Sequence, residues 1–178
     1  GFRVGNARLE FIPREAPKPA RMTLTLIALD EPTPSFAAMF TRNAFPGAPV
    51  IVGRRRLMEP SVGAVIINNK ISNVCAPGGV EAAEQVCAAV AQGLRLAPNQ
   101  VLPSSTGVIG WGLPVDAMLR EVPGMRSAES ENQASHSSRS MVPWGVRSIV
   151  MEGLVIRVHL PDCGARCASK VEESDIAA

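Results

Sequence analysis

The segment Val62–Asn68 constrains the fold more than any other part of the sequence, because it reads VGAVIIN and is apolar almost throughout. An apolar run of this length between turn-forming residues is typical of a strand buried in the core of a sheet. The chain has 178 residues, of which 46% are hydrophobic, so it is large enough to bury such a strand. We therefore expect a globular fold built around this strand.

A second clear pattern lies at residues 80–94, where Val86, Ala89, Val90 and Leu94 recur at helical spacing. Two glycines precede this segment and suit the entry from a loop into a helix. A further helix is expected from Leu113, with a proline near its first turn. We expect additional strands at residues 22–30, 35–42, 49–53, 99–104 and 148–160. These elements indicate a mixed α/β fold and leave its topology open.

Other segments carry weaker signals. A turn at residues 31–34 predicts that strands 22–30 and 35–42 form a hairpin. Residues 1–21 contain three prolines and several charges, so we expect an extended, partly irregular lead-in there. Residues 127–140 are polar and serine-rich, which predicts a loop or a disordered linker, and residues 168–178 are expected to fray.

The charge balance and the hydropathy of the chain bear on which partners are expected. The formal net charge is +2 and charged residues make up 19% of the chain, which gives no reason to expect binding to nucleic acid. The densest basic run, Arg54–Arg56, is interpreted as a solvated strand end or turn. No segment approaches the roughly 18–20 apolar residues needed to span a bilayer, and no signal peptide pattern is present, so we expect a cytoplasmic protein without membrane partners.

Four cysteines raise the question of a metal site, and in the cytoplasm they are expected to be reduced. His159, Cys163 and Cys167 recur every four residues, which would align them on one face of a helix. Pro161 and Gly164 argue against a regular helix there, and no fourth ligand is evident. We therefore expect neither a metal ion nor a cofactor.

The segment Ser104–Gly107 is the strongest candidate for chemistry, and the residues alone leave two interpretations open. A hydroxyl in such a turn can cap the next helix, while the glycine gives the backbone freedom to turn. Alternatively, outward-facing N–H groups and the Thr106 hydroxyl can bind an anion or oxyanion, because a glycine allows close approach.

Three blocks of sequence together resemble a known enzyme family. They are residues 40–43 with 48–50 (FTRN and APV), residues 64–75 (AVIINNKISNVC), and residues 105–110 with 113–118 (STGVIG and LPVDAM). The opening GFRVG also fits. Over residues 1–120 the chain resembles the ornithine acetyltransferases, or bifunctional glutamate N-acetyltransferases, of arginine biosynthesis. The third block is the most specific, whereas the second departs from the commoner form Asn-Ser-Gly-Asn-Ala-Asn.

The resemblance implies a fold in which β-sheets are packed between helical layers, here incomplete. It implies transfer of an acetyl group from N-acetylornithine to glutamate, with acetyl-CoA as a donor for some members. In that family the precursor cleaves itself, and a threonine becomes the N-terminal nucleophile of a second chain, the β chain. By position, Thr106 and Gly107 would form the oxyanion hole, and the partner chain would carry the nucleophile.

The resemblance fades after Glu121. The family's Met-Thr-Thr-Asp segment is absent, Lys170 is followed by valine rather than glycine, and no threonine follows Ala177-Ala178. We therefore expect two parts, an acetyltransferase-like α-chain region at residues 1–120 and a divergent, partly disordered tail at residues 121–178.

Three explanations remain for this change. The reading frame could have slipped near residue 120, the chain could be a divergent α chain, or it could be a non-catalytic homologue that only folds or associates. We favour the first, because the tail has neither family motifs nor a well-patterned alternative. In each case we expect the chain to be inactive by itself, because it contains no activated nucleophile.

Overall fold

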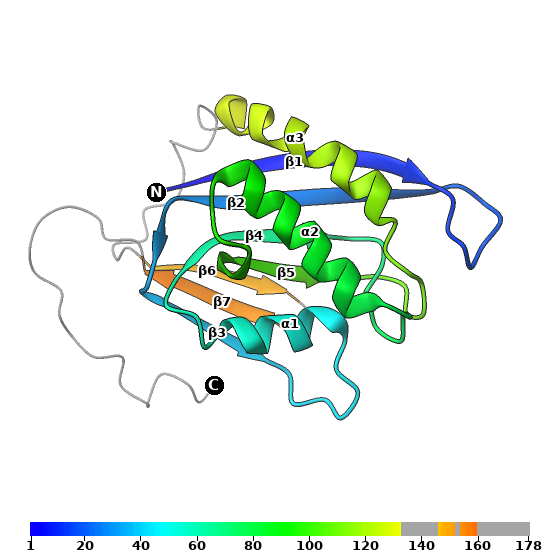
Figure 1. Cartoon of the computed structure of the whole chain (residues 1–178), viewed down its shortest axis with the longest axis horizontal. Coiled ribbons are helices and arrows are strands. Elements are labelled where there is room, and N and C mark those ends of the chain that lie inside the picture. The colour runs from blue at the N-terminus through cyan, green and yellow to red at the C-terminus, as the bar shows by residue number, and fades with distance from the viewer. Residues whose placement is uncertain (133–145, 152–153, 160–178) are drawn as a thin grey trace, which may run out of the picture.

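The structure, a computed structural model, describes residues 1–132, 146–151 and 154–159, with side chains described as far as residue 125 (Figure 1). It contains two β-sheets and three α-helices in this part of the chain. The strands are β1 (Phe2–Phe11), β2 (Ala20–Thr33), β3 (Phe36–Phe40), β4 (Val62–Asn68), β5 (Val101–Ser105), β6 (Val146–Met151) and β7 (Leu154–His159). The helices are α1 (Ala48–Arg56), α2 (Gly79–Leu94) and α3 (Val115–Asn132), with a short 3-10 turn, η1 (Pro98–Gln100), before β5.

The larger sheet has the strand order β1-β2-β4-β5. β1 and β2 form a long antiparallel hairpin, paired from Phe2 with Leu29 to Phe11 with Ala20. The expected extended, partly irregular segment at residues 1–21 agrees with an extended β1 followed by a loop at residues 12–19, but the pairing of β1 within the sheet was not predicted. All three prolines of this region lie in the loop between the two strands, so they do not interrupt the hydrogen-bonded ladder.

The main core lies between this sheet and helices α2 and α3, which cover one of its faces (Figure 1). Alternate residues of β2 point into this layer, as the period of two of a strand requires. The core residues of the sheet include Leu9, Phe11, Met22, Leu24, Leu26, Ala64, Ile66 and Val101, and those of the helices include Val86, Cys87, Val90, Ala91, Met118, Val122 and Met125. β4 is buried along its whole length, as its sequence predicts.

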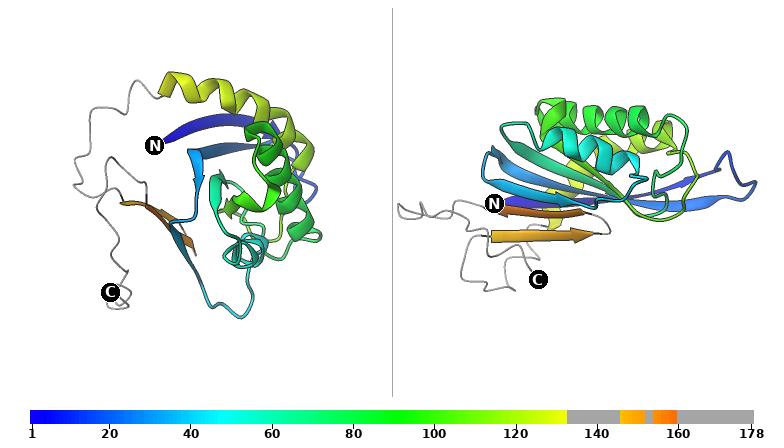
Figure 2. Two further views of the ribbon diagram at one scale, coloured as in Figure 1. Left: turned by 60° about the vertical axis from the view of Figure 1, so that its left-hand side comes forward. Right: turned by 90° about the horizontal axis from the view of Figure 1, so that it is seen from below.

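The opposite face of the larger sheet packs against β3, which belongs to a second sheet of order β3-β7-β6. Val65, Ile67 and Leu102 on this face form a second apolar cluster with Phe36 and Phe40 of β3. Figure 2 shows the resulting layers from below, with the helices, the larger sheet and the second sheet in succession. The layered α/β fold is thus confirmed. The predicted hairpin of residues 22–30 and 35–42 was wrong, because both edges of β2 are already paired, with β1 and β4.

Residues 49–53 form helix α1 rather than the expected strand. Pro49 stands in the first turn, where its fixed φ suits a helix and its missing N–H is not needed. The Ala48 amide donates to the Asn73 carbonyl at 3.0 Å, which ties the start of the helix to the loop after β4. The basic run is therefore the last turn of a helix, and the interpretation of Arg56 as solvated was wrong because this side chain is 5% exposed.

Most of the remaining predicted helices and strands agree with the elements of the structure. The strand at residues 62–68 and the helix at residues 80–94 are confirmed as β4 and α2, and residues 101–104 lie in β5. Helix α3 continues past residue 120 to Asn132, so the first part of the expected linker is helical, and residues 133–140 lie outside the described residues. The segment expected as a strand at 148–160 contributes to two antiparallel strands, β6 and β7. None of the described helices is long and apolar enough to cross a bilayer.

Candidate active site at the carboxyl ends of two parallel strands

The segment that the sequence singled out lies where β4 and β5 end side by side. These two strands are the parallel pair of the larger sheet, with Asn68 opposite Ser105 at their carboxyl ends. Figure 1 shows that the loops leading into α1 and α2 reach the same end of the molecule. The carboxyl ends of parallel strands are where α/β sheets commonly bind their ligands.

Beyond the strands, the backbone continues as a ladder between the β4–α2 loop and the turn at residues 106–110. Four hydrogen bonds make it: Thr106 N to Asn68 O at 3.0 Å, Val108 N to Lys70 O at 2.9 Å, Ser72 N to Val108 O at 3.0 Å, and Gly110 N to Val74 O at 2.8 Å. The parallel pairing therefore extends past the end of the sheet. It fixes the turn against the loop.

This ladder determines which amides remain available. The amides of Thr106 and Val108 both point to the loop, and successive amides of an extended segment face opposite sides, so the Gly107 amide faces away from the loop. β5 is the edge strand of its sheet, and no backbone hydrogen bond among the described residues uses the Gly107 amide. It is the outward donor that the functional interpretation of this turn requires.

Only glycine can occupy position 107 in this conformation. Its φ is +131°, a value that L side chains rarely adopt. A Cβ placed there would lie 2.2 Å from the Lys70 carbonyl oxygen and 2.9 Å from the Ile71 nitrogen. The close approach of the two backbones thus excludes any side chain, and the same approach aims the amide outward.

Thr106 is half-buried beside this amide. Its own N–H donates to Asn68, and its side chain carries the hydroxyl that the functional interpretation names as a second donor. Asn68 is buried and its side chain is held on both sides, donating to the Ile71 carbonyl at 2.6 Å and accepting from the Ser105 hydroxyl at 2.5 Å. The interpretation of the turn as a helix cap was wrong, because α3 begins only at Val115.

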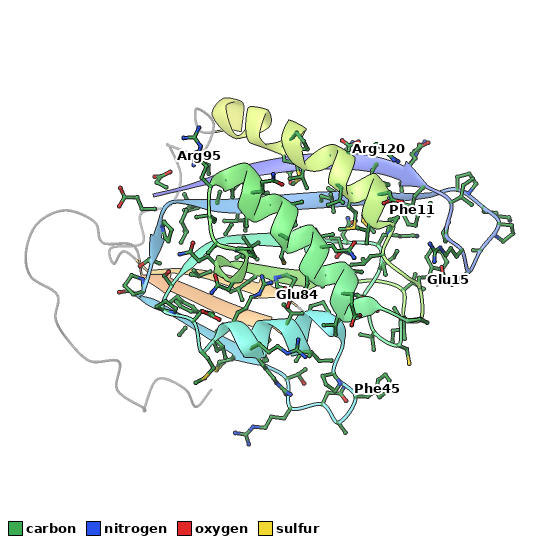
Figure 3. The ribbon with its side chains drawn as sticks, in the orientation of Figure 1. Phe11, Glu15, Phe45, Glu84, Arg95 and Arg120 are labelled. Carbon is green, nitrogen blue, oxygen red and sulfur yellow. The ribbon has the colours of Figure 1, made fainter. Side chains whose placement is uncertain are left out.

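Two further contacts lie next to the turn. The ammonium of Lys70 lies 5.9 Å from the centre of the Trp111 ring, within the range of a cation–π interaction. The Gly112 amide donates to the carboxylate of Glu15, in the β1–β2 loop, at 2.9 Å. Figure 3 labels Glu15 at the end of the molecule where β4 and β5 end.

Comparison with known proteins decides the family. The sequence pattern of the ArgJ family matches residues 14–141, which is most of the chain. The chain belongs to the ArgJ family.

Individual ArgJ proteins show the same relation. The arginine biosynthesis bifunctional protein ArgJ of Gluconobacter oxydans is 36% identical over 130 residues, which cover 69% of this chain and 31% of that protein. The ArgJ of Neisseria meningitidis serogroup A is 41% identical over 114 residues, covering 62% of this chain and 28% of that protein. The chain thus spans less than a third of the length of these relatives.

Solved ArgJ-family structures confirm the fold. The ArgJ of Bacillus halodurans superposes with a TM-score of 0.54 at 23% identity, covering 86% of this chain and 83% of that one. The ornithine acetyltransferase of Mycobacterium tuberculosis, solved in complex with ornithine, superposes with a TM-score of 0.61 at 22% identity, covering 95% and 92%.

In this ArgJ-family chain, the turn at Thr106 and Gly107 has neighbours in the fold that the sequence did not reveal. The contact of Lys70 with Trp111 joins a residue of the second block to one that lies between the two parts of the third block, so their separation in the sequence hides it. One feature of the sequence could have pointed to Lys70: this loop departs from the commoner Asn-Ser-Gly-Asn-Ala-Asn form, and the departure places a lysine at position 70.

The cysteines of this ArgJ-family chain give no nucleophile in the main core. Cys87 is fully buried, and this burial raises the pKa of its thiol to about 11, so the thiol stays protonated at neutral pH. Cys75 is free and exposed in the β4–α2 loop. No group of three metal-ligating residues occurs among the described residues, while Cys163, Cys167 and the side chain of His159 lie outside them.

Proposed function

We propose that this chain is the N-terminal, oxyanion-binding part of a glutamate N-acetyltransferase of arginine biosynthesis. The reaction moves an acetyl group from N-acetylornithine, or from acetyl-CoA, to glutamate in the cytoplasm. Membership of the ArgJ family supports this proposal, and the outward amide of Gly107 is the single structural observation that carries it. Residues 1–120 supply the site in this proposal, and residues 121–178 form a divergent region.

In the proposed mechanism, the Gly107 amide and the Thr106 hydroxyl hydrogen-bond to the acetyl oxygen. This oxygen becomes negatively charged when a nucleophile adds to the acetyl carbon, so donors fixed in advance stabilise the transition state more than the ground state. The two ladder bonds that flank Gly107 fix its amide before the substrate arrives. Fixing the donors avoids the cost of reorganising them during the reaction.

The nucleophile in this proposal is the N-terminal threonine of a second chain, with which the present chain forms a hetero-oligomer. The threonine hydroxyl attacks the acetyl carbon of N-acetylornithine, and the free α-amine of the same threonine takes the hydroxyl proton. The tetrahedral intermediate collapses with release of ornithine, whose amine is protonated as it leaves. The neutral amine of glutamate then attacks the carbonyl carbon of the acyl-threonine, and the bond from this carbon to the threonine oxygen breaks. The proton lost by the amine passes through the α-amine of the threonine to its oxygen, which restores the hydroxyl as N-acetylglutamate is released.

An acetyl-transfer assay tests this function. The purified chain is mixed with N-acetylornithine and glutamate, alone and after association with the nucleophile-bearing chain of an ArgJ relative is verified by size-exclusion chromatography. N-acetylglutamate is expected only from the complex. Replacing Thr106 by valine keeps the side-chain shape but removes the hydroxyl, and is expected to lower kcat by roughly a hundredfold. Thr106→Ser, which restores a hydroxyl, is the matched control and is expected to recover most of the rate.

Two results would contradict the proposal. Turnover by the isolated chain would show that the nucleophile lies within these 178 residues. An associated complex without any product would favour the alternative, a truncated or non-catalytic homologue acting only as a folded or interacting subunit.

A further inference from the structure

Lys70 is in direct contact with the oxyanion-binding turn through its backbone. Its carbonyl accepts the hydrogen bond of the Val108 amide at 2.9 Å. The same carbonyl oxygen is the atom that a Cβ on Gly107 would meet at 2.2 Å. The backbone of Lys70 therefore contacts the turn, and the Lys70 ammonium lies no farther from the turn than the length of a lysine side chain.

The ammonium of Lys70 carries a charge that no carboxylate balances among the described residues. It lies over the ring of Trp111, 5.9 Å from the ring centre, and both residues are half-buried. The carboxylate of Glu15 accepts the Gly112 amide and forms no ion pair with Lys70 within the described part of the chain. A cation–π contact leaves the ammonium positively charged and does not use up its N–H donors. The ammonium can therefore still donate hydrogen bonds to an anion.

Trp111 gives the lysine a fixed position. Its ring packs against the main core formed by the sheet with helices α2 and α3. A lysine on a flexible four-carbon stem loses much rotamer freedom when it binds a ligand, and a ring that already orients the ammonium reduces that loss. The contact therefore prepares a positive charge beside the turn before a ligand arrives.

The proposed substrate has an anion at a matching place. In an Nα-acetylated amino acid the amide nitrogen of the acetyl group is bonded to the Cα that also bears the carboxylate. When the acetyl oxygen lies at the Gly107 amide, the carboxylate is only a few bonds away. We propose that Lys70, oriented by Trp111, binds the α-carboxylate of the acetylated amino acid, an inference that rests on the proposed function and deepens it.

Ligand binding can be followed without catalysis, because Trp111 is one of two tryptophans in the chain. In a Trp144→Phe background, the emission of Trp111 reports displacement of the ammonium from its ring. The full chain is titrated with N-acetylornithine and, in parallel, with the carboxamide of N-acetylornithine, which lacks the negative charge. We expect the carboxylate ligand to bind about tenfold more tightly than the carboxamide, as a charge-assisted hydrogen bond provides.

Three variants separate this role from a merely structural one. Lys70→Met removes the charge and keeps an unbranched apolar stem, and it is expected to abolish the preference for the carboxylate while binding of the carboxamide is unchanged. Lys70→Arg keeps the charge and is expected to retain most of the preference. The control Arg95→Asn removes a cation at the far end of α2, where the left-handed conformation of residue 95 is tolerated by asparagine, and is expected to change neither affinity.

The outcomes decide between the alternatives. Equal binding of the two ligands by the parent chain, no emission change with N-acetylornithine, or equal loss of both affinities in Lys70→Met would each overturn the role of Lys70. Failure of the proposed function is a different result, in which the complex with a nucleophile-bearing chain binds N-acetylornithine in preference to the carboxamide but releases no N-acetylglutamate.

Discussion

At the scale of single residues, Gly107 links the local geometry of the chain to its proposed chemistry. Its φ of +131° and its approach to the Lys70 backbone let Thr106 and Val108 both donate to the β4–α2 loop. These two bonds leave the amide between them facing outward. A residue without a side chain therefore permits the close packing of two backbones and, in the proposed mechanism, is itself the donor.

Gly107→Ala tests this argument. The added Cβ would overlap backbone atoms of Lys70 and Ile71, which cannot move away as a side chain can, so we expect a loss of about 3 kcal/mol in the free energy of unfolding, measured with urea. In the complex with a nucleophile-bearing chain, kcat is expected to fall by roughly a hundredfold or more.

The same turn offers a matched control for this substitution. Gly110 also has a positive φ, of +86°, but a Cβ there would meet nothing within 4 Å. Gly110→Ala is therefore expected to cost only the backbone strain, about 1 kcal/mol, and to leave kcat within a few-fold of the parent value. Equal effects of the two alanines would show that the contact with the Lys70 backbone is unimportant.

At the scale of elements, α1 is held to α2 by a buried charge. The guanidinium of Arg56, at the end of α1, donates through Nη2 to the carboxylate of Glu84 on α2, and its Nη1 has no hydrogen-bond acceptor among the described residues. Figure 3 shows Glu84 on α2 above α1. Burying an arginine costs desolvation energy that a single partner offsets only in part, so this contact fixes the position of the helices more than it stabilises them.

Substitutions of the two partners are expected to change the free energy of unfolding differently. Glu84→Gln leaves the buried guanidinium without a counter-charge and is expected to lower the free energy of unfolding by about 1–2 kcal/mol. Arg56→Met removes the buried charge and fills a similar volume, so it is expected to be neutral or slightly stabilising. Urea unfolding of both variants measures the difference, and greater destabilisation by Arg56→Met would refute this account of the pair.

At the scale of the whole molecule, the larger sheet is the shared centre of the fold. One face packs under α2 and α3, and the other packs against β3 of the second sheet. The layers thus bury β4 on both faces and leave its carboxyl end, with that of β5, free to build the candidate site. Stability of the core and placement of the site therefore depend on the same strands.

The buried thiol of Cys87 makes the stability of this core sensitive to alkaline pH. Burial raises the pKa of the Cys87 thiol from 9.0, its value without the fold, to about 11. Between these values the unfolded state loses the proton and the folded state keeps it, so the stability present below about pH 9 is lost as the pH rises. We expect the free energy of unfolding to fall by about 2 kcal/mol by pH 11.

Urea unfolding as a function of pH measures this effect. Cys87→Ala is expected to remove this part of the pH dependence, whatever its effect at neutral pH. Cys75→Ser, which changes an exposed thiol, is the control and is expected to leave the dependence unchanged. A Cys87→Ala variant with the slope of the parent chain would show that burial of this thiol does not couple to folding.

Much of the fold was predictable from local patterns. The unbroken apolar run of β4 and the helical spacing in α2 identified both elements, because burial on both faces and burial on one helical stripe leave different periods in the sequence. Thr106 and Gly107 were singled out for the candidate site by their resemblance to a family rather than by the physics of the turn, and their role stays a prediction. The assignment of α1 failed, since the tertiary contact at Ala48 overrides the strand propensity of its β-branched residues.

The sequence by itself determined which segments are buried and which turn contains the glycine, because hydrophobic period and backbone freedom are properties of neighbouring residues. Only the tertiary structure decided which strands pair, that Arg56 is buried, and that the Lys70 backbone lies against Gly107. These contacts join residues far apart in the chain, and the side on which the Gly107 amide emerges follows from the hydrogen bonds that its two neighbours make with a distant loop.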